Sequence, residues 1–263
     1  MVKQHFVIPI ITESLFMACG RVHTLTLDAF GNVYAFGRNL KGQLGLEHKS
    51  NEGIGEVFDT NKLAKPSIED IPNRITSLRD IVQISCGGDH SACVSNSGEL
   101  WMFGDNSFGQ CTGRSNCYYH PTLVFHDVSM VSCGFNFTIC IKNNGEVYGA
   151  GKSDNGQLGR QQQGITRKFS RIYGLEAIRK IACGWEHTLC LNEEGNVFAM
   201  GQNGSGQLGI VKETYHHIVR DPQQIPNLPL IESIACGESH SLILTSEGIV
   251  LCCGNNIVLG FKD

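Results

Sequence analysis

The chain repeats itself, and this internal repetition constrains its fold more than any other feature. A Cys-Gly dipeptide, preceded by Ala or Ser, recurs at Cys19, Cys86, Cys133, Cys183 and Cys236. Successive copies lie 67, 47, 50 and 53 residues apart. A period of roughly 50 residues is typical of folds that assemble one small structural unit many times.

The glycine spacing inside each copy is stricter than the spacing between copies. From the glycine of each Cys-Gly, 11 residues lead to a second glycine and six more lead to a third. In four copies another five residues lead to a Gly-Gln pair, at 42–43, 109–110, 156–157 and 206–207. Glycine supplies 31 of the 263 residues, and most of these fall on repeat positions. We interpret them as turn and close-packing residues.

Each copy has the pattern of short antiparallel strands. In the fourth copy, residues 178–182, 187–191 and 196–201 are apolar or alternating segments, and a turn ending in Gly195 separates the last two. A fourth strand is predicted in the variable region before the next Cys-Gly, at 121–125, 168–172 and 221–225. No segment shows a convincing helical period.

Four short strands in each of five copies predict an all-β fold, a β-propeller of about five four-stranded blades. We expect one domain over residues 1–263. An N-terminal strand at residues 5–11 is predicted to complete the last blade, which would remove open sheet edges. Residues 46–80, between the first two copies, are predicted to form an insertion that leaves the propeller edge.

Composition narrows the classes of function. The net charge is −4 and no basic run is present, which argues against direct nucleic-acid binding. No apolar run reaches the ~18 residues of a membrane-spanning helix, and a signal peptide fits poorly. We therefore expect a cytoplasmic or nuclear monomer without membrane contact, in which the 12 cysteines stay reduced.

The Cys-Gly-x-x-His unit raises the alternative of a metal site. It places a Cys four residues before His23, His90, His187 and His240, and Phe137 replaces the histidine in the third copy. One such pair per blade makes no tight group of four ligands. We favour buried cysteines with hydrogen-bonded histidines and expect neither a metal nor a cofactor. The roles of three further cysteines, Cys117, Cys252 and Cys253, stay open.

The variable residues between the glycine and the histidine position are the best candidates for function. They lie in the loop between the first and second strands, so in a propeller all five pairs project from one rim. The mixture of carboxylates, an arginine and aromatic rings suits protein recognition. The candidate partner-binding residues are Arg21, Asp89, Phe135, Trp185, Glu186 and Glu238.

The motifs resemble the repeats of the regulator of chromosome condensation family. The first copy reads Ala-Cys-Gly-Arg-Val-His-Thr at 18–24, Gly-Asn-Val-Tyr-Ala-Phe-Gly-Arg-Asn at 31–39 and Gly-Gln-Leu-Gly at 42–45. The resemblance covers nearly the whole chain and implies a β-propeller. In exchange-factor members, acidic and histidine residues at the matching loop positions face the small GTPase Ran. Asp89, Glu186 and Glu238 resemble them.

The chain also departs from that family. We find five copies, whereas the founding members have seven blades, and residues 110–113 read Gln-Cys-Thr-Gly in place of Gly-Gln-Leu-Gly. The basic tail of the chromatin-binding member is absent from this sequence, and residues 46–80 contain no match to the small β-wedge that helps to expel nucleotide.

These observations favour a non-catalytic interaction scaffold that binds a protein partner through one loop rim. The alternative is a guanine-nucleotide exchange factor for a Ran-like small GTPase, which needs no covalent chemistry. A hydrolase or metal enzyme ranks last, because no arrangement of nucleophile, base and orienting residue stands out.

Overall fold

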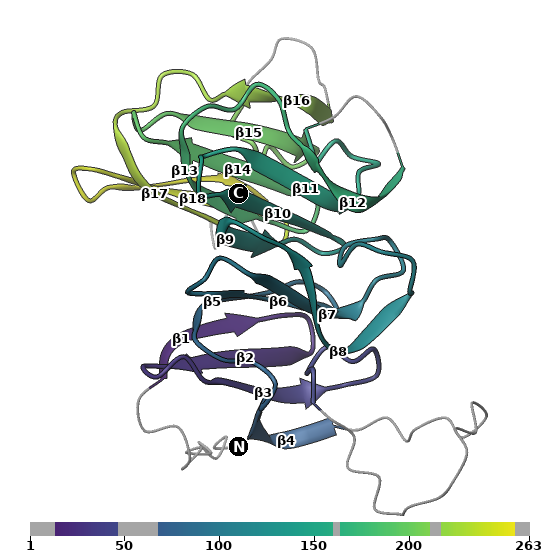
Figure 1. Ribbon diagram of the computed structural model, residues 1–263. Helices are drawn as coiled ribbons and strands as arrows, with labels where there is room; N and C mark the ends of the chain where they lie inside the picture. Colours follow the sequence, from purple (N-terminus) through teal and green to yellow (C-terminus); the bar gives the residue numbers. More distant parts are fainter. Residues whose placement is uncertain (1–13, 47–67, 160–163, 211–216, 256–263) are drawn as a thin grey trace, which may run out of the picture.

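The fold consists of five antiparallel sheets, the blades of a propeller (Figure 1). The computed structural model describes residues 14–46, 68–159, 164–210 and 217–255, and all regular elements in these ranges are β-strands. Blade one contains β1 (Ser14–Cys19), β2 (His23–Asp28), β3 (Val33–Arg38) and β4 (Ile68–Arg74). Blade two contains β5 (Ile81–Cys86), β6 (His90–Ser95), β7 (Leu100–Asp105) and β8 (Cys117–Phe125).

The other three blades repeat this plan, with neighbours in the sheet following the order of the chain. Blade three contains β9 (Val128–Cys133), β10 (Phe137–Lys142), β11 (Val147–Lys152) and β12 (Ile165–Arg171). Blade four contains β13 (Ile178–Cys183), β14 (His187–Asn192), β15 (Val197–Gln202) and β16 (Ile218–Gln224). Blade five contains β17 (Ile231–Cys236), β18 (His240–Thr245) and β19 (Val250–Gly254). The predicted all-β, five-blade propeller is confirmed.

Glycine sets the turn between the second and third strands of each blade. In blade four, Gly195 has a φ of 83° and donates its N–H to the carbonyl of Asn192 at 3.2 Å. A residue with a side chain rarely adopts this left-handed conformation, which explains why every copy has glycine here.

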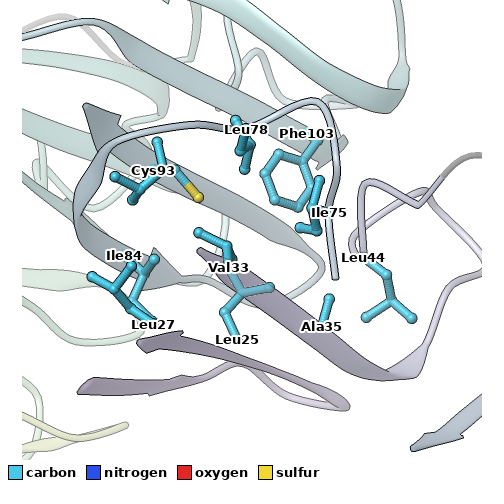
Figure 2. Packing of buried hydrophobic residues seen from close by; sticks show 11 residues of the cluster. Leu25, Leu27, Val33, Ala35, Leu44, Ile75, Leu78, Ile84, Cys93 and Phe103 are labelled. Atoms are coloured by element: carbon cyan, nitrogen blue, oxygen red, sulfur yellow. The ribbon is translucent and has the colours of Figure 1, made fainter. Parts of the chain in front are cut away.

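The hydrophobic core lies between neighbouring blades. In Figure 2, Leu25 and Val33 of blade one face Ile84 and Cys93 of blade two, and Leu25, Val33 and Cys93 are fully buried. Equivalent clusters join blades two and three, three and four, and four and five. The innermost strands contact each other in the order β1, β5, β9, β13 and β17, and among the described residues no comparable contact joins β17 to β1.

The predicted insertion at 46–80 is wrong in its second half. Residues 68–74 form β4, and Ile75 and Leu78 after it are buried in the core, each 1% exposed. The N–H of Ile75 donates to the carbonyl of Val33 at 2.9 Å, as Ile172 and Ile225 do to the third strands of their blades. This segment is therefore an ordinary outer strand. Residues 47–67 lie outside the described residues.

The other outer strands begin earlier than predicted, at Cys117, Ile165 and Ile218, because they pair with nearly the full length of the preceding strand. The predicted closing strand at residues 5–11 lies outside the described residues. No helix in the described ranges is long and apolar enough to cross a membrane.

Candidate functional site

The candidate site is formed by the five loops between the first and second strands of the blades, which we call the rim. These loops, residues 20–22, 87–89, 134–136, 184–186 and 237–239, meet around a cavity of about 230 Å³, which we call the axial pocket. Four predicted site residues line this pocket, namely Arg21, Phe135, Trp185 and Glu238. The repeat thus brings residues more than 200 positions apart to one place.

A series of backbone hydrogen bonds holds the rim loops together. The N–H of Arg21 donates to the carbonyl of Gly88 at 3.2 Å, and Gly88 donates to Phe135 at 3.0 Å. Phe135 donates to Trp185 at 3.3 Å, and Trp185 donates to Glu238 at 3.2 Å. These bonds use the main chain, so the rim side chains can vary without loss of the loop arrangement.

The aromatic part of the rim is a pair of rings from different blades. The centroids of Phe135 and Trp185 lie 4.8 Å apart, and Trp185 is 43% exposed. Glu238 lies beside them on the pocket wall and is exposed. Tryptophan is enriched among the residues that contribute most of the binding energy in protein interfaces, and this ring is both packed against a neighbour and accessible.

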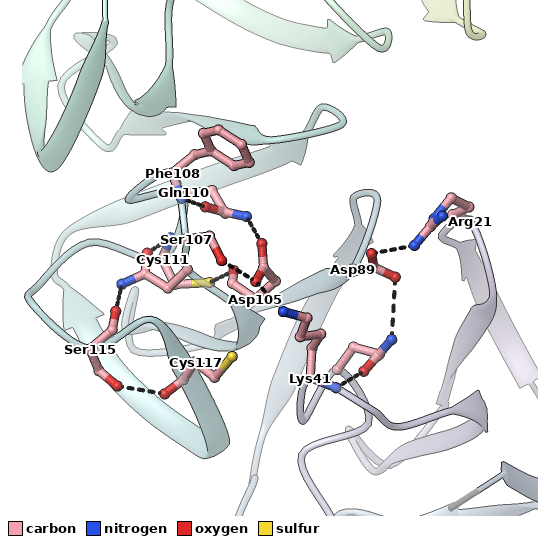
Figure 3. A network of polar contacts seen from close by, with 12 residues as sticks. Arg21, Lys41, Asp89, Asp105, Ser107, Phe108, Gln110, Cys111, Ser115 and Cys117 are labelled. Atoms are coloured by element: carbon pink, nitrogen blue, oxygen red, sulfur yellow. Dashed lines mark hydrogen bonds and ion pairs between the residues drawn. The ribbon is translucent and has the colours of Figure 1, made fainter. Parts of the chain in front are cut away.

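Asp89 and Glu186 lie on the rim but do not line the axial pocket. Asp89 binds Arg21 at 2.5 Å and accepts a bond from the amide of Gln43 at 3.4 Å, both from blade one (Figure 3). Glu186 lies 3.7 Å from the ammonium group of Lys152. Both carboxylates therefore have partners within the protein.

Gln43 and Lys152 were not among the predicted site residues. Gln43 belongs to the Gly-Gln pair of the first copy, and its side-chain oxygen accepts the N–H of Lys41 at 2.8 Å, which closes its own turn. Its repeat position is visible in the sequence, although its contact with Asp89 depends on how the blades pack. Lys152 ends a third strand and has no motif that marks it.

The repeated histidines at the start of the second strands join neighbouring blades. His23 Nε2 lies 2.9 Å from Ser91 Oγ, and His187 Nε2 lies 3.0 Å from Ser241 Oγ. Burial lowers the pKa of His23 and His187 to about 4, and that of His90 to about 3. These rings are therefore neutral at pH 7. Since His90 Nε2 also lies 2.9 Å from Thr138 Oγ1, the expectation of hydrogen-bonded structural histidines is confirmed for all three.

The cysteines of the Cys-Gly pairs also line the axial pocket. Burial raises the pKa of the Cys133 and Cys236 thiols to about 12, so they are poor nucleophiles. Cys19 is exposed, unlike the buried cysteine that the repeat predicts. Within the described ranges, no group of three or more His, Cys, Asp or Glu side chains is arranged to hold a metal ion.

Comparison with known proteins finds one matching family and several relatives. A family model described as the RCC1-like domain matches residues 5–262. The human X-linked retinitis pigmentosa GTPase regulator is 42% identical over 93 residues, which are 35% of this chain and 8% of that protein. The Protein RCC2 homolog of Xenopus laevis is 36% identical over 102 residues, 39% of this chain and 17% of that protein. The chain thus spans a small part of these relatives.

Solved structures resemble the fold over most of the chain. Human WBSCR16 has a TM-score of 0.74 at 23% identity, covering 90% of this chain and 61% of that one. Prp20p from Saccharomyces cerevisiae has a TM-score of 0.69 at 21% identity, covering 90% of this chain and 71% of that one. At this identity the likeness shows the fold alone.

Proposed function

Because the chain belongs to the family of RCC1-like domains, we propose that it is a non-catalytic interaction scaffold of the cytoplasm or nucleus that binds a partner protein through the rim. The observation that carries the proposal is the Trp185–Phe135 pair that lines the axial pocket. Trp185 is large and half exposed, and the backbone bonds of the rim hold it in place. A preorganised aromatic anchor loses little entropy on binding.

The charge around this anchor favours a partner that presents a basic side chain. Glu238 is exposed on the pocket wall, whereas Asp89 and Glu186 are already paired with Arg21 and Lys152. A lysine or arginine of the partner could meet both the Trp185 ring and the Glu238 carboxylate, which combines a cation–π contact with an ion pair.

Affinity capture with matched variants tests this proposal. Trp185→Ala removes the anchor. Tyr173→Ala is the control, because it removes an exposed ring outside the rim; Tyr173 is 73% exposed and Trp185 is 43% exposed. Proteins retained by the wild type and by Tyr173→Ala but lost from Trp185→Ala are the expected result. A retained set that is identical for all three proteins contradicts the proposal.

The second candidate function is nucleotide exchange on a Ran-like small GTPase. It is supported by the name of the human relative, a GTPase regulator, which is 42% identical over 93 residues. Prp20p, which is described as binding Gsp1p and histones, shares the fold at 21% identity. Exchange would require tight binding of the nucleotide-free GTPase through rim carboxylates.

Release of labelled GDP from a panel of small GTPases tests this candidate. If it holds, Asp89→Ala and Glu186→Ala each slow the release while the thermal unfolding profile of the protein stays cooperative. Unaccelerated release from every GTPase contradicts the exchange function and leaves the scaffold proposal to be decided by the capture experiment.

A further inference from the structure

A larger cavity lies beside blade two, at the end of the strands opposite to the rim. Its volume is about 390 Å³, and its walls come from the β4–β5 loop, the end of β6, the turn after it and the start of β7. Neighbouring strands of a blade run antiparallel, so this turn and this loop point away from the rim loops. We call the cavity the turn pocket. Apart from Trp101 its lining is polar, and it includes Arg79, Asp80, Ser95 and Glu99.

In blade three the corresponding place is filled by two cationic side chains of the protein itself. The Lys142 ammonium group lies 3.4 Å from the Asp127 carboxylate and 5.9 Å from the ring centroid of Tyr148. The Arg171 guanidinium group lies 2.7 Å from the Glu146 carboxylate. Each carboxylate therefore has an ion pair, and the ring has a cation–π contact.

The groups that hold these cations recur around the turn pocket. Asp80, Glu99 and Trp101 occupy the repeat positions of Asp127, Glu146 and Tyr148. All three line the pocket. The main chain shows the same correspondence, because the carbonyl of Asp80 accepts an N–H of the β6–β7 turn at 2.8 Å, as the carbonyl of Asp127 does from the β10–β11 turn.

The cations themselves have no counterpart in blade two. Ser95 takes the place of Lys142, since each donates its N–H to the carbonyl of the residue four positions later, at 3.0 and 2.9 Å. Leu123 takes the place of Arg171, since each is the outer-strand residue that pairs with the aromatic residue of the third strand. At this position blades one and four carry Arg74 and Gln224. Among the described outer strands, blade two alone has an apolar residue here.

Two carboxylates of the turn pocket are therefore left without a cation. Within the described ranges neither Asp80 nor Glu99 takes part in an ion pair, and the Glu99 carboxylate accepts a hydrogen bond from the Ser95 hydroxyl at 3.4 Å. Arg79 lines the same pocket but pairs with neither carboxylate, so the lining has one more carboxylate than it has cations. The pocket keeps the anionic and aromatic groups of the blade-three site and has a cavity beside them instead of the cations.

We propose that the turn pocket binds a lysine or arginine side chain of another polypeptide, with the cationic group between the Asp80 and Glu99 carboxylates and against the Trp101 ring. The bound group makes the contacts that Lys142 makes in blade three. An ion pair and a cation–π contact then act on the same group. The pocket is separate from the rim, so this proposal does not depend on the proposed function of the rim.

The chain has two tryptophans, Trp101 and Trp185, and this allows a specific readout by NMR. In the Trp185→Phe variant the indole N–H signal reports on Trp101 alone, so binding at the rim contributes nothing to it. The ligand is a capped Gly-Lys-Gly peptide, whose only charge is on the lysine side chain, or its arginine analogue. The same peptide with norleucine keeps the aliphatic chain without the charge and is the control ligand. The titration extends to about 30 mM at constant ionic strength, because a single contact of this kind supports millimolar affinity.

Further substitutions in the Trp185→Phe background test the charges. Glu99→Gln removes one carboxylate and Leu123→Arg supplies an internal cation, so each is expected to weaken binding at least about threefold. Arg79→Gln removes an opposing charge and is expected to strengthen binding. Glu146→Gln is the matched control, because that carboxylate is already paired with Arg171, and it should leave the affinity unchanged. A cooperative thermal unfolding profile shows that each variant is folded.

Both cationic peptides are expected to shift the Trp101 signal saturably, and the norleucine peptide is not. A Trp101 signal that neither cationic peptide shifts would overturn the proposal. An equal shift with the norleucine peptide, or an affinity that neither Glu99→Gln nor Leu123→Arg lowers, would overturn it as well.

Discussion

The indole of Trp185 lies against the phenyl ring of Phe135, with their centroids 4.8 Å apart, although the two residues belong to different blades. Neighbouring rim loops are hydrogen-bonded through their backbones, which places the two rings side by side. Trp185 nevertheless stays 43% exposed. Because much of the ring stays accessible to solvent, we expect Trp185 to contribute more to partner binding than to stability.

Trp185→Ala is therefore expected to separate binding from folding. Loss of an aromatic anchor weakens partner binding by at least about tenfold. The free energy of unfolding falls by about 1 kcal/mol or less, because the ring is half exposed and gives up one aromatic contact. Calorimetry of binding and urea unfolding of the same variant measure the two effects. Equal losses in both would mean that Trp185 is a structural residue.

The pair of Arg21 and Asp89 is expected to couple blades one and two weakly. Their charged atoms lie 2.5 Å apart, but the two side chains are 47% and 22% exposed. Partly exposed pairs contribute about 0.2–1 kcal/mol, and salt screens them. A double-mutant cycle with Arg21→Ala and Asp89→Ala in urea measures the coupling. It should shrink in high salt, and a coupling that is independent of salt would contradict this electrostatic account.

Acid is expected to destabilise the propeller through its buried histidines. The pKa of His187 is lowered to about 4 in the folded state from 6.5, mainly by burial. Between these values the unfolded chain binds the proton and the folded chain does not, so stability falls as the pH drops below about 6.5. The expected loss between pH 7 and pH 5 is on the order of 1–2 kcal/mol per buried histidine.

His187→Phe copies the natural replacement at Phe137 and removes one titrating group. Its free energy of unfolding should change less between pH 7 and pH 5 than that of the wild type. His126→Asn, at an exposed histidine, is the matched control and should leave the slope unchanged. The slope, rather than the stability at one pH, is the readout, because the lost bond to Ser241 lowers stability at every pH.

Substitution of two glycines separates the cost of backbone strain from the cost of a steric clash. Gly174 has a φ of 82° and open space around it, so Gly174→Ala should cost about 1 kcal/mol through strain alone. Gly201 has a φ of 109°, and an added Cβ would lie 2.5 Å from the carbonyl oxygen of Glu186. Gly201→Ala should cost at least about 1 kcal/mol more. Chemical denaturation compares them, and equal losses would contradict the close-packing role of the repeat glycines.

Much of the fold could be predicted because the repeat fixes which residues take equivalent places. The outer strand β4 was missed although a signal exists: Ile68 and Ile75 bracket it as Ile165 and Ile172 bracket β12. A search for the Cys-Gly motif does not detect this spacing, and the long segment before β4 hides it. The positions of rim residues followed from the repeat, because loops of equivalent strands project from the same side.

The partners of the rim carboxylates could not be predicted. Asp89 binds Arg21 and Glu186 binds Lys152 through contacts that depend on the rotation between neighbouring blades. The exposure of Met17 and Val250 could not be predicted either, since their repeat positions indicate buried residues. Each blade has the same sequence pattern, so the pattern alone does not show which blades have a neighbour on both sides.

Site-specific photo-crosslinking measures directly whether a partner protein binds at the rim. A photoreactive amino acid is placed at position 185 in one variant and at position 173, which is more exposed and lies outside the rim, in another. Position 185 is expected to crosslink to a discrete partner protein, and position 173 is not. Crosslinking of the same proteins in the same amounts from both positions would contradict it.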